Sequence, residues 1–130
     1  MRLPILLQAL LVATGGALGS VARFFMAGAA HGLLPGVLFP VGTLAVNLSG
    51  SLVIGLFGGL AEGRDFLVPE VRLLLFTGVL GGFTTFSAFA WETLGLALDA
   101  AWWRFALNVT AQVVLGLGAV AGGYFLGRAL

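Results

Sequence analysis

The stretch Gly81-Gly82-Phe83-Thr84-Thr85-Phe86-Ser87 lies near the middle of an apolar segment that runs from about Val71 to Leu98. The segment is longer than the roughly 20 residues that one membrane crossing needs. Adjacent glycines, two β-branched threonines and a serine disfavour a continuous helix. We therefore expect a local break that frees backbone carbonyls and amides. In a membrane, such a break is tolerated only inside protein or beside water.

The whole chain is as apolar as this segment. It has 130 residues, of which 60% are hydrophobic and 8% charged, and its mean hydropathy is +1.13. Soluble domains carry about 25% charged residues, so a water-soluble fold is excluded. The composition predicts an all-α integral membrane protein, one domain over residues 1–130. We expect four transmembrane helices, at about 3–27, 41–61, 71–98 and 102–126, the third broken near its middle.

The amino-terminal run resembles a cleavable signal peptide, because an arginine at position 2 precedes an apolar stretch. Apolar residues resume through Val21, Phe24 and Phe25, so the stretch is long enough to cross the bilayer. We therefore expect an uncleaved first span. The connection that follows is expected to contain His31, Pro35 and Pro40.

The charge distribution is nearly balanced. Six basic residues and five acids give a net charge of +1, which leaves no electrostatic footprint for a nucleic-acid partner. With four spans, both termini share one face with four arginines, against two on the other face. This bias is weak, so insertion in both orientations is allowed. The two sets are Arg2, Arg64, Arg72 and Arg128, and Arg23 and Arg104.

A polar stripe is expected on the second span, where Thr43, Asn47, Gly50 and Ser51 recur at helical spacing. Small and weakly polar residues often only join helices in membranes, and the stripe alone favours that interpretation. Asn47 at mid-span argues against it, because a carboxamide there needs a polar partner. Asn108 and Gln112, one turn apart, form a second polar stripe on the fourth span.

Two phenylalanines, Phe86 and Phe89, lie three residues apart just after the expected break. Taken alone, they are typical of lipid contact or core packing. The alternative is that the positive edges of their rings face an anion while the apolar rings exclude cations. Arg23 and Glu92 are the ionisable residues nearest to membrane depth. Their positions near span ends favour snorkelling or a rim salt bridge.

Glycines four residues apart recur along the chain and predict close approach of helices. The pairs are Gly15 and Gly19, Gly55 and Gly59, Gly78 and Gly82, Gly118 and Gly122, and Gly123 and Gly127. The sequence contains no cysteine and one histidine, which excludes disulfides, thiolate sites and multi-histidine sites within one subunit. No nucleophile–base pair, carboxylate pair or phosphate loop appears, so we do not expect an enzyme.

Three stretches resemble the Fluc family of fluoride channels, and the resemblance covers all four spans. They are Gly15-Gly16-Ala17-Leu18-Gly19-Ser20-Val21-Ala22-Arg23, Gly42-Thr43-Leu44-Ala45-Val46-Asn47-Leu48-Ser49-Gly50 and Gly81-Gly82-Phe83-Thr84-Thr85-Phe86-Ser87-Ala88-Phe89. The third is the most specific. The resemblance implies a passive channel of the prokaryotic plasma or inner membrane that exports cytoplasmic fluoride and so reduces its toxicity.

The resemblance also implies an antiparallel, dual-topology homodimer in the lipid bilayer, with two ion pathways built from both subunits. Phe86 and Phe89 would line the pore, Asn47 would be an amide donor with Thr43 nearby, and Arg23 would support the vestibule. The backbone carbonyls of Gly81 and Thr84 would hold a structural sodium ion.

Two positions depart from the family pattern. Ala88 stands where relatives usually have threonine, and Gln112 stands where many have a small hydroxyl residue. Gln112 remains a donor, with a longer reach, and stays a candidate for the fluoride path.

Two rival functions remain open. A four-span, proton-coupled small multidrug exporter needs a membrane-buried carboxylate, and the first two spans contain no acid. A non-transporting structural membrane subunit would not require the glycine- and threonine-rich stretch beside a mid-membrane asparagine.

Overall fold

The structure, a computed structural model, describes residues 3–62 and 68–130, which form four long helical segments. The first two are α1 (Ile5–Leu33) and α2 (Val41–Ala61). The third comprises α3 (Pro69–Arg72), the π-helical η1 (Leu73–Leu80), α4 (Gly81–Phe83) and α5 (Phe86–Leu98). The fourth comprises α6 (Trp102–Thr110), the π-helical η2 (Ala111–Leu115) and α7 (Gly116–Ala129).

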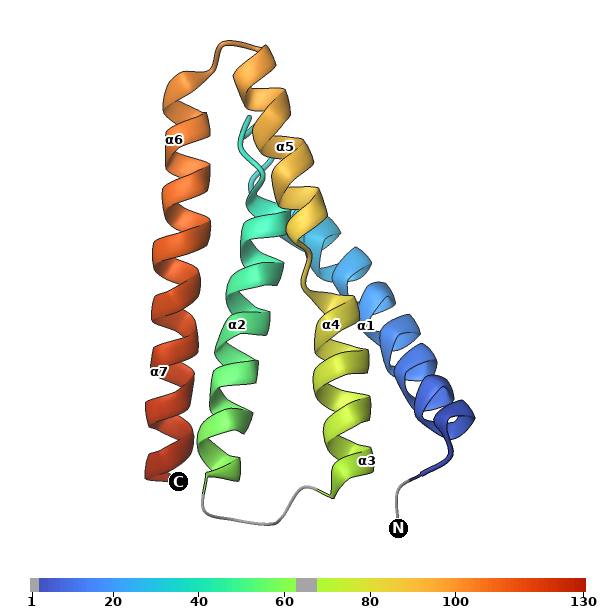
Figure 1. Ribbon diagram of the computed structural model, residues 1–130. Helices are drawn as coiled ribbons and strands as arrows, with labels where there is room; N and C mark the ends of the chain where they lie inside the picture. The colour runs from blue at the N-terminus through green and yellow to red at the C-terminus, as the bar shows by residue number, and fades with distance from the viewer. Residues whose placement is uncertain (1–2, 63–67) are drawn as a thin grey trace.

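All four segments are long and apolar enough to cross a membrane. Helices α2 and α7 run side by side, α1 inclines away from them, and the start of α1 and the end of α7 lie at the same end of the bundle (Figure 1). This places α3 and the end of α7 at one end and the α5–α6 turn at the other. Arg2 and Arg64, which enter the arginine balance, lie outside the described residues.

Helix α1 continues six residues beyond the predicted end of the first span. It ends at Leu33, because Pro35 and Gly36, whose φ is +80°, cannot continue it. His31, predicted to lie in the connection, instead occupies the last turn. There its Nδ1 donates to the carbonyl of Ala27 at 2.8 Å.

Two glycine seams bring helix backbones into contact. A Cβ added at Gly55 would lie 2.1 Å from the Val120 carbonyl oxygen, and one added at Gly123 would lie 2.1 Å from that of Leu52. These positions, with Gly59 and Gly127, make up the α2–α7 seam. The α1–third-segment seam uses Gly15, Gly19, Gly78 and Gly82 in the same way.

Within one chain, Gly118 and Gly122 do not bring helices together. No described residue lies within 4 Å of a Cβ built at either position. Both belong to α7, on which the contacting pair is Gly123 and Gly127. The four-residue spacing therefore identified the glycine pairs, but it did not indicate which pair lies on the face of α7 that packs against α2.

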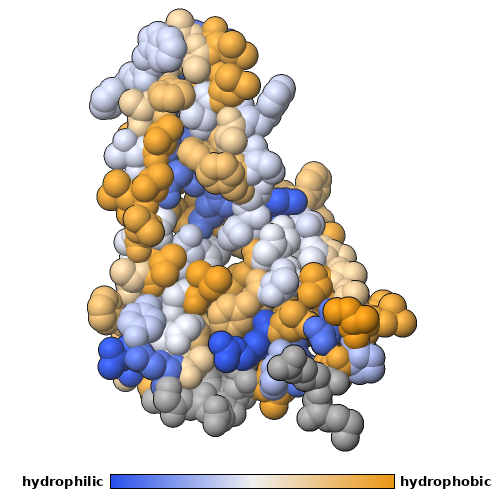
Figure 2. Space-filling model, viewed as in Figure 1, coloured by the Kyte–Doolittle hydropathy of each residue, from blue (hydrophilic) through white to orange (hydrophobic). Residues whose placement is uncertain are grey.

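The outer surface is apolar and the interior is small. Among the described residues, the buried hydrophobic side chains are Val46, Leu80 and Ala111, whereas Phe24 and Trp103 are about three-quarters exposed at 73% and 76%. Hydrophobic colours cover much of the visible face, and hydrophilic ones gather at its lower end and at mid-height (Figure 2). This pattern suits an exterior that faces lipid, with polar groups collected at one level.

Candidate ion path

The third segment bends at Thr84 and Thr85. Both have extended backbone angles, with φ/ψ of −78°/158° and −152°/118°, so α4 ends at Phe83 and α5 begins at Phe86. The Thr85 hydroxyl accepts the Ala88 amide at 3.2 Å and so caps α5. The segment remains a single candidate span, Pro69–Leu98.

Asn47 of α2 takes over the hydrogen bonding of Thr85. Its Oδ1 accepts the Thr85 N–H at 2.8 Å, and its Nδ2 donates to the Thr85 carbonyl at 3.0 Å. Nδ2 also donates to Oε1 of Gln112 at 3.1 Å. A carboxamide at mid-span thus satisfies the backbone at the bend and links three of the four helical segments.

The bend removes the helical donors of several carbonyls, among them those of Gly81 and Thr84. In a continuous helix these two would accept from the amides of Thr85 and Ala88. Those amides donate instead to Asn47 and to the Thr85 hydroxyl. Carbonyl oxygens without such donors are suitable ligands for a hard cation. These two carbonyls therefore fit the sodium ion that the family resemblance implies.

A groove of about 440 Å³ runs along this bend. Six of the eight predicted site residues line it: Asn47, Gly81, Thr84, Phe86, Phe89 and Gln112. The rings of Phe86 and Phe89 meet edge to face, with centroids 5.5 Å apart and an angle of 61° between their planes. Phe86 is 78% exposed. None of the lining residues is ionisable, so the groove offers amide, hydroxyl and ring-edge contacts without a carboxylate.

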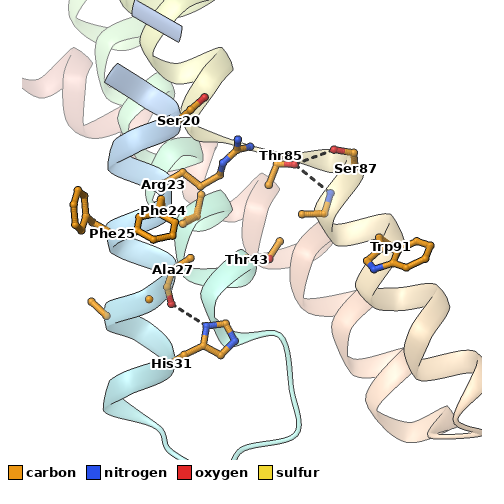
Figure 3. A pocket seen from close by; sticks show the side chains of 14 residues that line it. Ser20, Arg23, Phe24, Phe25, Ala27, His31, Thr43, Thr85, Ser87 and Trp91 are labelled. Atoms are coloured by element: carbon orange, nitrogen blue, oxygen red, sulfur yellow. Dashed lines mark hydrogen bonds between the residues drawn. The ribbon is translucent and has the colours of Figure 1, made fainter. Parts of the chain in front are cut away.

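The other two predicted residues, Arg23 and Thr43, line a second, larger groove of about 940 Å³ between α1, α2 and α5. Arg23 extends from α1 toward Thr85, and His31 lies farther along the same helix (Figure 3). Thr85 lines both grooves. Arg23 and Thr43 are thus near the bend, but they do not face the same groove as the two phenylalanines.

A polar layer joins residues that the sequence analysis named separately and adds one, Thr93, that it did not name. The Thr43 hydroxyl donates to Oε1 of Glu92 at 2.6 Å, whereas Glu92 was expected to snorkel or to form a rim salt bridge. Asn108, fully buried, donates to the Thr93 hydroxyl at 2.9 Å. Glu92 lies three residues after Phe89, on the turn of α5 that faces α2, and no spacing in the sequence indicates that this turn faces the second span.

The sequence of the chain is similar to those of known proteins. A family model described as "CrcB-like protein, Camphor Resistance (CrcB)" matches residues 10–124. A fluoride-specific ion channel FluC from Maridesulfovibrio salexigens is 43% identical over 119 residues, covering 92% of this chain and 94% of the relative. Proteins with the same name from Rhizobium etli and Opitutus terrae are 46% and 50% identical. The Rhizobium alignment covers 96% of this chain and 99% of the relative, and the Opitutus alignment covers 85% of each.

Proposed function

The chain belongs to the CrcB-like family, and we propose from this premise that fluoride crosses it passively through the groove at the Thr84–Thr85 bend. The curated relatives are fluoride-specific ion channels, and this chain is a fluoride channel, not an enzyme. It is a multi-pass protein of the prokaryotic membrane. The observation that carries the proposed route is the convergence of two phenylalanine rings and two carboxamides on one groove.

The chemistry of the groove suits a small anion. Fluoride is strongly hydrated, so a selective path must replace its water with N–H and O–H donors. Asn47 and Gln112 supply the carboxamides, and the edges of Phe86 and Phe89 supply a weakly positive apolar surface. The absence of ionisable groups among the lining residues avoids repulsion of the anion. Larger and more weakly hydrated anions gain less from such donors.

We propose that Arg23 and Thr43 lie where fluoride enters this route. Both line the larger groove, which adjoins the bend through Thr85. A guanidinium there raises the local concentration of anions. Thr43 keeps its hydroxyl on Glu92 and so holds that carboxylate beside α2.

The working unit is an antiparallel homodimer with dual topology. On the isolated chain, the groove lies open beside a 78% exposed phenylalanine on an otherwise apolar surface. A second copy related by a two-fold axis in the membrane plane would cover this groove and complete a path from both subunits. The arginine imbalance, four against two, is weak enough to permit both orientations.

The Thr84–Thr85 bend acts in this dimer as the break that holds a structural sodium ion. The Gly81 and Thr84 carbonyls of both copies would be its ligands, since both have lost their helical donors. The cation satisfies backbone that would otherwise be costly in a membrane. It also adds a positive charge beside the anion route.

The cellular role follows from acid–base chemistry. Hydrogen fluoride crosses membranes as a neutral molecule and ionises in the less acidic cytoplasm, and the anion then leaves through the channel down its gradient. No energy source is required. A proton-coupled exporter would instead need a membrane-embedded carboxylate, and Glu92 is the residue that such a mechanism would use.

Efflux from liposomes tests the proposal. The purified protein is reconstituted into vesicles loaded with potassium fluoride or potassium chloride. Valinomycin is then added so that potassium can leave together with the anion. We expect fluoride release without chloride release, at a rate that a protonophore does not change. Matched vesicles without protein give the background. Release of chloride at a similar rate, or a requirement for a proton gradient, would contradict the proposal.

A further inference from the structure

His31 is the only histidine of the chain, and its ring is held in place in the last turn of α1. A Cβ added at Gly42 would lie 2.5 Å from Cε1 and 2.6 Å from Nδ1 of the ring, so the imidazole packs directly against the backbone at the start of α2. Nδ1 also lies 2.8 Å from the Ala27 carbonyl oxygen. The ring is therefore fixed on two sides, although the residue is exposed.

The ring lines the larger groove, as Arg23 does. Both side chains extend from α1 toward this groove, and His31 lies nearer to the end of the helix (Figure 3). The two residues are eight positions apart in the sequence, which corresponds to about 12 Å along a helix. Because this groove adjoins the bend through Thr85, two basic side chains follow one another along the approach to the proposed route.

Arg23 and His31 are the two ionisable residues among those that line the larger groove. Helix α2 contributes no ionisable side chain, and neither does the connection 34–40. The ionisable residue of α5 is Glu92, but its Oε1 accepts the Thr43 hydroxyl, and it lines a separate groove of about 380 Å³. The charge of the larger groove therefore depends on an arginine, which is always protonated, and on the protonation state of His31.

Protonation of His31 adds a charge without breaking its contact with α1. In the neutral ring Nδ1 carries the hydrogen, because its partner is a carbonyl oxygen, which can only accept. A second proton then binds Nε2, which the bond to Ala27 does not occupy. Histidine is the side chain whose charge ordinarily changes between about pH 5 and pH 8, so this charge varies over the pH range that bacteria meet.

We infer that His31 is a second, pH-dependent cationic residue at the entrance of the fluoride route, so that efflux through this chain increases as the pH falls. The inference rests on the proposed function and adds regulation to it. A positive charge at this position raises the local concentration of fluoride along the groove. Acting over about 12 Å, one added charge should change the flux about two- to fourfold at low salt, and less at high salt, which screens it.

This response would follow the load of fluoride. An acidic medium drives more neutral hydrogen fluoride into the cell, and the same medium would protonate His31 of the copy whose groove opens outward. The competing explanation is that His31 only packs the end of α1 against Gly42. A purely structural role predicts no dependence of the flux on pH.

Efflux from liposomes at two pH values tests the inference. The full-length protein is reconstituted at low ionic strength, with the same pH inside and outside, so that both orientations of the chain meet one pH. Between about pH 7.5 and about pH 5.5, we expect the fluoride efflux of wild type to rise about two- to fourfold. Protein-free vesicles at each pH give the leak of neutral hydrogen fluoride, which is subtracted.

Two substitutions fix the charge at this position. His31→Gln keeps an N–H donor for the Ala27 carbonyl but stays neutral, so its efflux should remain at the slower rate at both pH values. His31→Arg is always charged, so its efflux should remain at the faster rate. Arg128→Gln is the matched control, because it removes a positive charge in the last turn of α7, at the opposite end of the bundle, and should keep the pH response of wild type (Figure 1).

Each outcome decides the inference. A flat wild-type profile would overturn it, and so would a pH response that persists in His31→Gln, which would assign the response to another group such as Glu92. Slow efflux from folded His31→Arg at both pH values would show that charge is not the cause, and would also overturn it; if that variant does not fold, His31→Lys replaces it. Wild-type protein that releases no fluoride at either pH would instead contradict the proposed function.

Discussion

The α2–α7 seam and the Thr84–Thr85 bend hold helices together in opposite ways. The seam has no side chain between its backbones, because glycines let carbonyl oxygens of one helix contact the other directly. The bend is held by a side chain, since Asn47 replaces the hydrogen bonds that the helix gives up. Lipid supplies no hydrophobic force between helices, so close packing and polar contacts carry the association. The seam therefore provides the scaffold, and the bend provides the chemistry.

Filling the seam should have the largest effect on stability. In Gly55→Val, the new Cβ would lie 2.1 Å from the Val120 carbonyl oxygen, a contact that requires the two helices to separate. We expect loss of folded protein, measured as loss of the monodisperse peak in size-exclusion chromatography after detergent extraction.

Gly118→Val is the matched control for this prediction, because no residue that the structure describes lies within 4 Å of a Cβ at that position. It should extract and elute like wild type. Equal behaviour of the two variants would show that the backbone contact does not stabilise the helix pair.

Replacing the rings at the bend should greatly slow fluoride efflux and spare the fold. Phe86→Ile and Phe89→Ile keep apolar bulk but lose the positive ring edges, so we expect fluoride efflux to fall about tenfold or more for each variant. The elution profile and thermal stability should remain close to wild type, since Phe86 is largely exposed. Normal efflux from the folded double variant would return both rings to lipid contact or packing.

Asn47→Asp should affect both stability and flux. The aspartate can still accept the Thr85 N–H, but it places a second acceptor against the Thr85 carbonyl and Gln112 Oε1. We expect a loss of about 1–3 kcal/mol in unfolding free energy and suppressed efflux, measured by thermal denaturation and in liposomes. Asn47→Asp with unchanged flux and stability would contradict the role of the carboxamide at the bend.

Removing the ion pair at the end of the α2–α7 seam should have the smallest effect. Arg128 Nε lies 3.2 Å from Glu62 Oε2, and the two side chains are 54% and 48% exposed. Exposed pairs contribute about 0–1 kcal/mol, so Arg128→Gln should change the thermal midpoint little, and less at high salt. A large loss would mean that this end of the seam, and not its glycines, holds α2 to α7.

The sequence patterns predicted those features that depend on local chemistry. The weak helix-forming residues around Thr84 and Thr85 gave the location of the bend, and apolar length gave four segments able to span. The spacing of Thr43 and Asn47 placed both on one face of α2. The family resemblance then indicated which residues of this face matter.

Features that depend on contacts between distant segments could not be predicted. The Thr43–Glu92 hydrogen bond joins residues 49 positions apart, and no periodicity indicates which turn of α5 faces α2. The outward orientation of Gly118 and Gly122 depends in the same way on the rotation of α7. The extension of α1 past Ala27 was missed because the prediction placed the helix end where the apolar run ends, whereas the helix continues to Leu33 and ends only before Pro35 and Gly36.

The bond between Asn47 and Thr85 also predicts how the two positions tolerate mutation. Asn47 contributes its side chain, so only a residue with both a carbonyl oxygen and an amide nitrogen at that length can replace it. Thr85 contributes mainly its backbone, which every residue except proline possesses, and its hydroxyl caps α5 as serine or aspartate also would. In a saturation library selected for growth in fluoride, position 47 should therefore accept almost no substitutions and position 85 several.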